Sequence, residues 1–409
     1  MPLPFHTFLR ALPVAFLLLC TGCLPAWAQI PVLTTDKQAL ENVKLAMEKI
    51  YAFEFDQTDT YLKRLKPKYN NHPVIGLVTA LNMYWKYLPV SEYPEEYIEY
   101  KKLLNTVSDQ SNKMLEKDPN NAEGTFFQMM AMMMLAKHES DAGEYGHAIN
   151  HASKAYRNIQ KGFGMKSRYP EFYFTCGVYD YYRVLYPELN PFYGPLMGLF
   201  AAGSKANGLA ELKIAGEKSV FTGTEAYIYL ARITLYHEMK PAEALEFAKA
   251  IRAENPKNTY IASLTSECLV AARQYEEAEK TVAGIRDMAN PFYRVMGEAL
   301  QGMIYEKGEK NTAQARTWYL KALETSKKVK KNGGHAAGLS YAGLARLADA
   351  AGEKDKAMSY YKKAFDLCQW QSIRNEAKAY NFDENPNKVK KQNAKAAKAE
   401  AKAAKKAAK

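Results

Sequence analysis

The stretch EALEFAKAIRAENP, residues 243–256, carries the spacing on which the prediction of the fold rests. Ala244, Ala248 and Ile251 lie on one face of a helix at this spacing, and Pro256 follows shortly after that face ends. Small side chains on a helix face let a neighbouring helix approach closely. The stretch is therefore predicted to be one helix of a tightly packed pair.

The same spacing returns three times further along the chain. The first return begins at Ala278, 34 residues after Ala244. A period of this length is typical of a helical repeat whose unit is two antiparallel helices. The later copies are Ala278, Val282 and Ile285; Ala315, Tyr319 and Ala322; and, after an insertion at residues 327–334, Ala357, Tyr361 and Ala364.

Residues from about 225 to 370 resemble tetratricopeptide repeats. The last unit matches in its first helix as well, where four residues stand at the positions of the family pattern W-x2-L-G-x2-Y. These residues are Tyr341, Leu344, Ala345 and Ala348. The resemblance implies an all-α fold, an α-α superhelix whose concave side binds a protein or peptide.

The N-terminal half repeats the helical pattern less regularly. An apolar stripe follows Thr35-x-x-Gln38, which has the form of a capping box. No segment alternates polar and apolar residues over a strand's length, so no sheet is predicted. The apolar stripe is Leu40, Val43, Met47 and Ile50, and small-residue spacing returns at Ala148, Ala152 and Ala155.

The predicted organisation has five parts. They are a signal peptide at residues 1–28, degenerate tetratricopeptide-like helical repeats at 29–161, an atypical aromatic-rich helical insert at 162–225, a tetratricopeptide array at 226–370 and a flexible Lys/Ala-rich tail at 371–409.

The insert contains the aromatic stretch CGVYDYYRVLYPELNPFYGPLMGLF at residues 176–200. Four residues in and just before it have helical spacing and predict a face turned to the core. They are Phe174, Val178, Tyr181 and Leu185.

A second face of the same helix has no apolar neighbour within its own hairpin. Its residues are tyrosines and an arginine, types that are enriched at binding sites. The alternative is that both faces are sandwiched between neighbouring helices. The predicted partner-binding residues are Tyr179, Tyr182, Arg183 and Tyr186.

Two clusters have the composition of a metal site. His147 and His151 are four residues apart, with Glu144 one turn earlier, and two imidazoles on one helix face can bind zinc. Five methionines between residues 129 and 134 could hold a soft metal such as Cu(I). A polar flank is the preferred interpretation of the histidines, since H-E-x-x-H is absent. Core packing is preferred for the methionines, since a helix apolar all round is usually buried, so no metal site is predicted.

The sequence contains no nucleophile elbow G-x-S-x-G, no phosphate loop and no G-x-G-x-x-G turn. We therefore predict no catalytic residue, no cofactor and no enzymatic activity. Beyond the leader the cysteines are Cys176, Cys268 and Cys368, an odd number that predicts buried free thiols rather than a disulfide framework.

The first residues have the order of a secretory leader: Arg10, an apolar run at 11–20 and then small residues. Cleavage after Ala28 is favoured, because Ala26 and Ala28 fit the A-x-A rule, and lipidation of Cys23 is the alternative. The apolar run is too short to span a bilayer. The sequence thus predicts an exported protein, periplasmic or associated with the outer membrane, with no transmembrane span in the mature chain.

The formal charge of +12 is concentrated at the C-terminal end. Residues 388–409 hold nine lysines against one glutamate, which leaves about +3 on the body of the protein. The tail is predicted to be solvated and to rest on an anionic envelope surface. Nucleic acid is not expected as a partner, because the leader predicts export.

These features together favour an exported scaffold or adaptor that binds a protein or peptide partner in the cell envelope. The alternative is a small-molecule or lipid-binding periplasmic protein whose pocket is the aromatic central block.

The leader can be tested directly on protein isolated from the native cell. We expect the mature N-terminus to be Gln29, or a lipidated Cys23 in the alternative cleavage, as read by N-terminal sequencing and intact mass. A native protein that begins at Met1 would exclude export.

Overall fold

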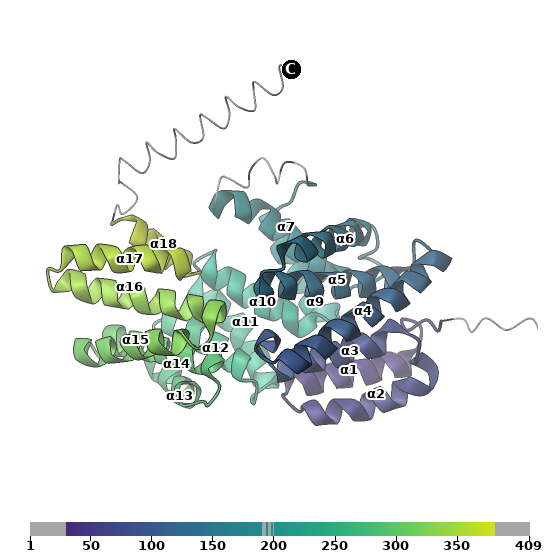
Figure 1. Cartoon of the computed structure of the whole chain (residues 1–409), viewed down its shortest axis with the longest axis horizontal. Helices are drawn as coiled ribbons and strands as arrows, with labels where there is room; N and C mark the ends of the chain where they lie inside the picture. The colour runs from purple at the N-terminus through teal and green to yellow at the C-terminus, as the bar shows by residue number, and fades with distance from the viewer. Residues whose placement is uncertain (1–29, 190–193, 195–197, 199, 381–409) are drawn as a thin grey trace, which may run out of the picture.

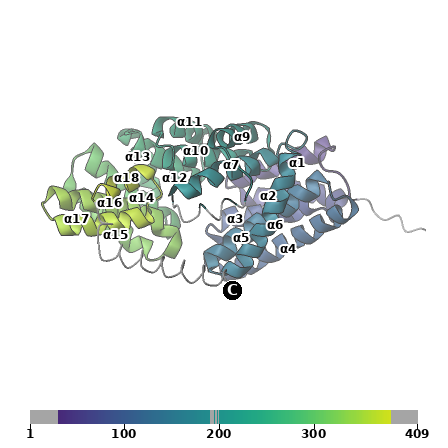
Figure 2. The same cartoon turned by 90° about the horizontal axis from the view of Figure 1, so that it is seen from above.

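The computed structural model describes residues 30–189, 194, 198 and 200–380, and this part contains helices and no strand. The helices follow one another as an arch, with α1 to α6 at one end and α13 to α18 at the other (Figures 1 and 2). The predicted all-α helical repeat array is confirmed. The predicted cleavage site, Cys23 and the lysines of residues 388–409 lie outside the described residues.

The first half is built from long helices, and those from α1 to α7 follow one another after short connections (Figure 1). They are α1 (Lys37–Tyr51), α2 (Phe55–Tyr69), α3 (Pro73–Lys86), α4 (Pro94–Lys117), α5 (Ala122–Ala142), α6 (Tyr145–Phe163), α7 (Phe172–Leu189) and α9 (Lys205–Lys218), with a 3-10 turn η1 at Val90–Glu92.

The second half continues the series with helices of more even length. They are α10 (Gly223–Tyr236), α11 (Pro241–Glu254), α12 (Thr259–Ala271), α13 (Tyr275–Arg286), α14 (Pro291–Met303), α15 (Thr312–Ser326), α16 (Gly334–Ala350), α17 (Lys354–Leu367) and α18 (Gln371–Lys378), with a π-helical segment η3 at Ile304–Gly308 and a 3-10 turn η4 at Lys330–Gly333.

Each helix packs mainly on its neighbours in sequence, which is the arrangement of a solenoid. In the second half of the chain, the repeated spacing lies on every other helix, α11, α13, α15 and α17. It marks the face of each of these helices that packs inward. Every position of that spacing is buried: Ala244, Ala248 and Ile251 in α11; Ala278, Val282 and Ile285 in α13; Ala315, Tyr319 and Ala322 in α15; and Ala357, Tyr361 and Ala364 in α17.

Tyr319 shows how an aromatic residue fits between such helices. Its ring lies between α14 and α16, and each of these helices has a glycine where it faces the ring. A Cβ at Gly302 would lie 2.5 Å from the ring, and one at Gly343 would lie 2.1 Å from it. The hydroxyl of Tyr319 donates to Glu306 at 2.5 Å, which satisfies the buried polar group. No larger residue fits at either glycine without moving the ring.

The two halves of the arch also contact each other through residues that are far apart in the sequence. Asn258 at the start of α12 donates through its side chain to the backbone oxygen of Tyr51 at 2.8 Å. Trp85 of α3 packs edge-on against Tyr260, with ring centroids 5.3 Å apart. These contacts join the beginning of the chain to its second half.

Two local predictions for the first half are wrong. The cap of α1 is Asp36, whose carboxylate accepts from the backbone N–H of Ala39 at 3.0 Å, so Thr35 is not the cap and the expected Thr35-x-x-Gln38 box does not form. A carboxylate is the better cap here because Lys68 also binds it, at 2.7 Å. Ala152 is exposed, since only one side of α6 packs on the core.

The buried residues also show the state of the cysteines. Cys176, Cys268 and Cys368 are all buried and free.

Among residues 30–189, 194, 198 and 200–380, no helix is both long enough and apolar enough to cross a membrane.

The packing at Ala357 yields a test of the repeat register. Ala357 is 0% exposed in α17, whereas the next residue, Met358, is 42% exposed. We expect Ala357→Arg to destabilise the protein by several kcal/mol, roughly the sum of overpacking and a buried charge. Thermal unfolding of this variant and of the control Met358→Arg measures the difference. Equal unfolding midpoints would show that the register is wrong.

Candidate functional site

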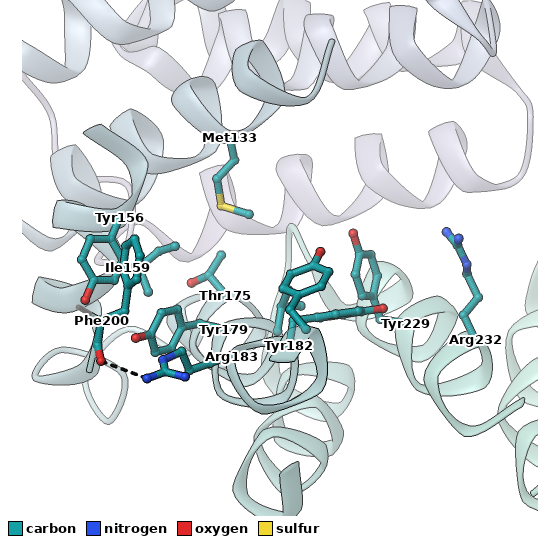
Figure 3. A pocket seen from close by; sticks show the side chains of 12 residues that line it. Met133, Tyr156, Ile159, Thr175, Tyr179, Tyr182, Arg183, Phe200, Tyr229 and Arg232 are labelled. Carbon is teal, nitrogen blue, oxygen red and sulfur yellow. Dashed lines mark hydrogen bonds between the residues drawn. The ribbon is translucent and has the colours of Figure 1, made fainter. Parts of the chain in front are cut away.

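A pocket of about 410 Å³ lies between α7 and the helices α5, α6 and α10 (Figure 3). Its wall is mostly aromatic, with two arginines. The lining residues are Met133, Tyr156, Ile159, Thr175, Val178, Tyr179, Tyr182, Arg183, Tyr186, Phe200, Tyr229 and Arg232.

One face of α7 is fixed in the core. Phe174, Tyr181 and Leu185 are buried and pack with residues of α9 and α10. Helix α9 approaches closely because two glycines meet, and a Cβ at Gly208 would lie 2.7 Å from the carbonyl oxygen of Gly177. Since this face is held by α9 and α10, the opposite face of α7 is left to line the pocket.

All four residues predicted for partner binding lie on the wall of this pocket. Tyr179, Tyr182 and Arg183 are half-buried, and Tyr186 is 47% exposed. Val178, predicted for the core face, is also half-buried and joins the lining. Their part in binding stays a prediction, but they are brought together in one place.

The chain at residues 200–201 forms a second wall and is tied to α6 and α7. The hydroxyl of Tyr179 donates to the backbone oxygen of Ala201 at 2.6 Å, and Arg183 donates to that of Phe200 at 3.3 Å. The rings of Tyr156 and Phe200 meet edge to face, with centroids 4.8 Å apart. This wall is therefore held by both hydrogen bonds and ring contacts (Figure 3).

Helix α10 also contributes to the pocket, which the sequence patterns did not predict. Tyr229 and Arg232 face the pocket from this helix, opposite the residues of α6 (Figure 3). A signal was present: the helix GTEAYIYLARITLY is apolar except for a few residues, and Arg232 and Glu225 are its only charges. A lone arginine in such a helix indicates a special environment.

Arg232 is held by neutral groups. It donates to the hydroxyl of Tyr260 at 3.2 Å and to the side-chain oxygen of Gln369 at 3.3 Å, and it lies over the ring of Tyr236. Within the part of the chain that the structure describes, no carboxylate forms an ion pair with Arg232 or Arg183. The direct contacts of both guanidinium groups are therefore with neutral oxygens and, for Arg232, with a ring face.

The donors of Arg183 are also incompletely used. Its Nε is buried without a hydrogen-bond acceptor among the described residues. Guanidinium groups form their strongest hydrogen bonds with anionic acceptors. An occupant with carbonyl or carboxylate oxygens would complete the bonding of this side chain.

Three tyrosines of the pocket, Tyr179, Tyr182 and Tyr229, are neutral at physiological pH. Burial raises the pKa of Tyr182 to about 12, and it raises the pKa values of Tyr179 and Tyr229 as well. Each hydroxyl can therefore donate one hydrogen bond and accept others.

A second pocket, of about 320 Å³, adjoins the first at Arg232, which lines both. It lies between the two halves of the chain and includes Tyr84 and His138 from the first half and Tyr260 and Glu267 from the second. Burial lowers the pKa of His138 to about 3, so this imidazole is neutral. The two pockets together extend the aromatic site toward the centre of the arch.

The histidines and most of the methionines that were considered as metal ligands are engaged elsewhere, exposed or buried in the core. His151 binds Glu139 at 2.7 Å, and His147 is exposed. Met129, Met130 and Met132 are buried in the core. In the described ranges, no group of three or more His, Cys, Asp or Glu side chains is placed to hold one metal ion.

Comparisons with known proteins bear on the family. Two family models of the tetratricopeptide repeat match the chain, one over residues 235–291 and one over residues 296–369. No curated protein matches the chain significantly.

Solved structures similar to the chain include yeast Tom70, at 12% identity and a TM-score of 0.29, with 88% of this chain and 99% of that chain covered. They also include a dimer of human IFIT1 with m7Gppp-AAAA, at 15% identity and a TM-score of 0.33, with 83% of this chain and 96% of that chain covered. Likeness at this level carries no argument about binding.

The two faces of α7 are expected to respond differently to truncation. Tyr181 is 0% exposed, and its hydroxyl donates to Glu238 at 2.5 Å, so Tyr181→Ala should cost about 3–5 kcal/mol of stability. Tyr182 is half-buried on the pocket, and Tyr182→Ala should cost much less. Denaturant unfolding of both variants measures this. Equal, large losses would mean that both faces serve only the core.

Proposed function

Residues 235–291 and 296–369 are tetratricopeptide repeats, and on this premise we propose that the chain is an exported scaffold that binds a protein or peptide partner in the cell envelope. Repeat proteins of this kind offer extended surfaces for protein interaction. The leader at residues 1–28 supports export, and the lysines of residues 388–409 suit an anionic envelope surface.

The pocket of α7 is the observation that carries the proposal. It gathers tyrosines and arginines, the residue types that dominate binding energy at protein interfaces. Its walls come from α5, α6, α7 and α10, so it is formed only in the folded array. A partner segment that inserts a side chain here would meet ring faces, hydroxyls and the unused donors of Arg183.

The pocket of about 320 Å³ beyond Arg232 extends this site. An extended peptide that enters the first pocket can continue along the second, where Tyr260 and Glu267 supply hydrogen-bonding groups. Arg232 at the junction would bind a backbone carbonyl or an acidic side chain of the peptide. The partner is accordingly expected to present an aromatic or aliphatic anchor near an acceptor group.

A small-molecule or lipid ligand is the second candidate for the same pocket. Its volume of about 410 Å³ falls in the range of ligand sites, about 300–1,000 Å³. An apolar aromatic wall with a few polar groups is also typical of such sites.

The test uses the chain without residues 1–28 as bait in envelope extract from the native cell. We expect one stoichiometric protein to be retained. We expect Tyr182→Ala and Arg232→Gln to lower its affinity by about tenfold or more, because both residues contact the proposed segment. Arg64→Gln, an exposed arginine of α2 outside the pocket, is the matched control and should bind as the wild type does.

Unfolding midpoints of all variants separate binding from stability. Retention of the same protein by both pocket variants would contradict the proposal. A small ligand released from the denatured wild-type protein, but not from Tyr182→Ala, would establish the second candidate instead.

A further inference from the structure

A separate pocket, of about 640 Å³, lies where α18 meets the turns of three successive repeats. Met239, Arg273 and Lys310 stand in the turns that follow α10, α12 and the segment η3, and all three line the pocket. Each has left-handed backbone, with φ of 55°, 63° and 58° respectively. The sharp turn that closes each repeat therefore brings one side chain after another to the same rim.

Helix α18 covers the other side of this pocket. The side-chain nitrogen of Asn375 lies 3.7 Å from the sulfur of Met239, which joins α18 to the turn after α10. Trp370 and Ile373, at the start of α18, line the pocket and are each 4% exposed. Helix α18 thus closes over the turns of the repeats.

The bottom of the pocket is apolar, and we name its residues the apolar floor. They come from three helices of the second half, α10, α12 and α14, and from the start of α18, and all are buried. The apolar floor is Leu235, Val270, Met303, Trp370 and Ile373.

The rim of the pocket is positively charged. Arg273 and Lys310 are exposed, and Lys307 of η3 is half-buried. None of the three forms an ion pair or a side-chain hydrogen bond with another described residue. Three cations at the mouth of one pocket, none of them in an ion pair with a described residue, are an arrangement that a ligand of negative charge would stabilise.

The carboxylate of Glu376, which also lines the pocket, is already engaged. It accepts from Arg346 at 3.2 Å and from the hydroxyl of Tyr361 at 2.9 Å. Burial lowers the pKa of Lys307, as do the positive charges of Arg346 and Arg273, whereas the carboxylates of Glu306 and Glu376 raise it. Lys307 is thus a partly desolvated cation, and the two carboxylates near it already accept hydrogen bonds from Arg346.

We propose that this pocket binds an anionic amphiphile, a molecule with a carboxylate or phosphate head and one apolar chain. The head lies among Arg273, Lys307 and Lys310, and the chain lies on the apolar floor. A head of this charge gains charge-assisted hydrogen bonds from the rim. A chain removed from water gains in proportion to the apolar area that it buries.

The lining of the pocket favours a ligand that has both an anionic head and an apolar chain over a ligand that has only one of these parts. An inorganic anion would use the rim and leave the apolar floor wet. An uncharged lipid would use the floor and leave the three cations unpaired. The volume of about 640 Å³ suits a small ligand with both parts.

The experiment compares ligands that differ in one part only. Decanoate and decyl phosphate carry both parts, 1-decanol lacks the charge, and inorganic phosphate lacks the chain. Binding to the chain without residues 1–28 is measured by calorimetry, with tryptophan fluorescence as a second signal because Trp370 lies in the pocket. We expect saturable one-to-one binding of decanoate or decyl phosphate, about tenfold or more tighter than that of decanol or inorganic phosphate.

The variants test the rim. Lys307→Gln combined with Lys310→Gln should weaken binding of the anionic ligand by about tenfold or more. Lys280→Gln, an exposed lysine of α13 outside the pocket, should leave binding unchanged. Lys310→Glu, at an exposed position, serves as a second variant in case the double variant unfolds, and unfolding midpoints are recorded for each.

Several outcomes would overturn the proposal: no saturable binding of either anionic amphiphile, equal binding of decanol and decanoate, or binding unchanged in the rim variants. A preference for decyl phosphate over decanoate, or the reverse, identifies the head group. The site shares no residue with the pocket of α7, so its failure leaves the proposed scaffold function untouched.

Discussion

The structure depends on the close approach of neighbouring helices at alanine and glycine positions. Where α15 crosses α14 and α16, Tyr319 occupies space that exists only because Gly302 and Gly343 have no side chain. The same constraint acts at Gly177 and Gly208, where α7 meets α9. Because buried apolar area stabilises the array only when the helices are in contact, these small residues determine which helix packs on which.

Close packing also forces buried polar groups to find partners inside the protein. Glu306 accepts from Tyr319 and Arg346, and Arg346 extends the network to Glu376. In the first half, Glu123 accepts from the backbone of Leu33 at 3.1 Å and thereby ties the start of the described chain to α5. Buried carboxylates thus fix loops and turns whose own sequences carry little structural information.

The candidate sites follow from the places where this packing is incomplete. Helix α7 uses one face for α9 and α10, and its other face borders a pocket that α5, α6 and α10 fill only in part. The pocket of about 640 Å³ arises where three turns of the repeats meet α18, so that cations of neighbouring repeats share one rim. In both places, side chains that a regular array would leave exposed line one shared pocket. A helix outside the matched repeats forms part of each pocket: α7 in the first case and α18 in the second.

The sequence by itself determined the all-α repeat and the register of its second half, since the spacing of Ala244, Ala278, Ala315 and Ala357 is a local property of helices that pack in pairs. It also indicated the two faces of α7, because helical periodicity is local as well. Only the tertiary structure brought Tyr229 and Arg232 to the same pocket, and it gathered Arg273, Lys307 and Lys310 under α18. Such contacts depend on how different helices pack against one another. The periodicity within one helix does not specify which other helix packs against it.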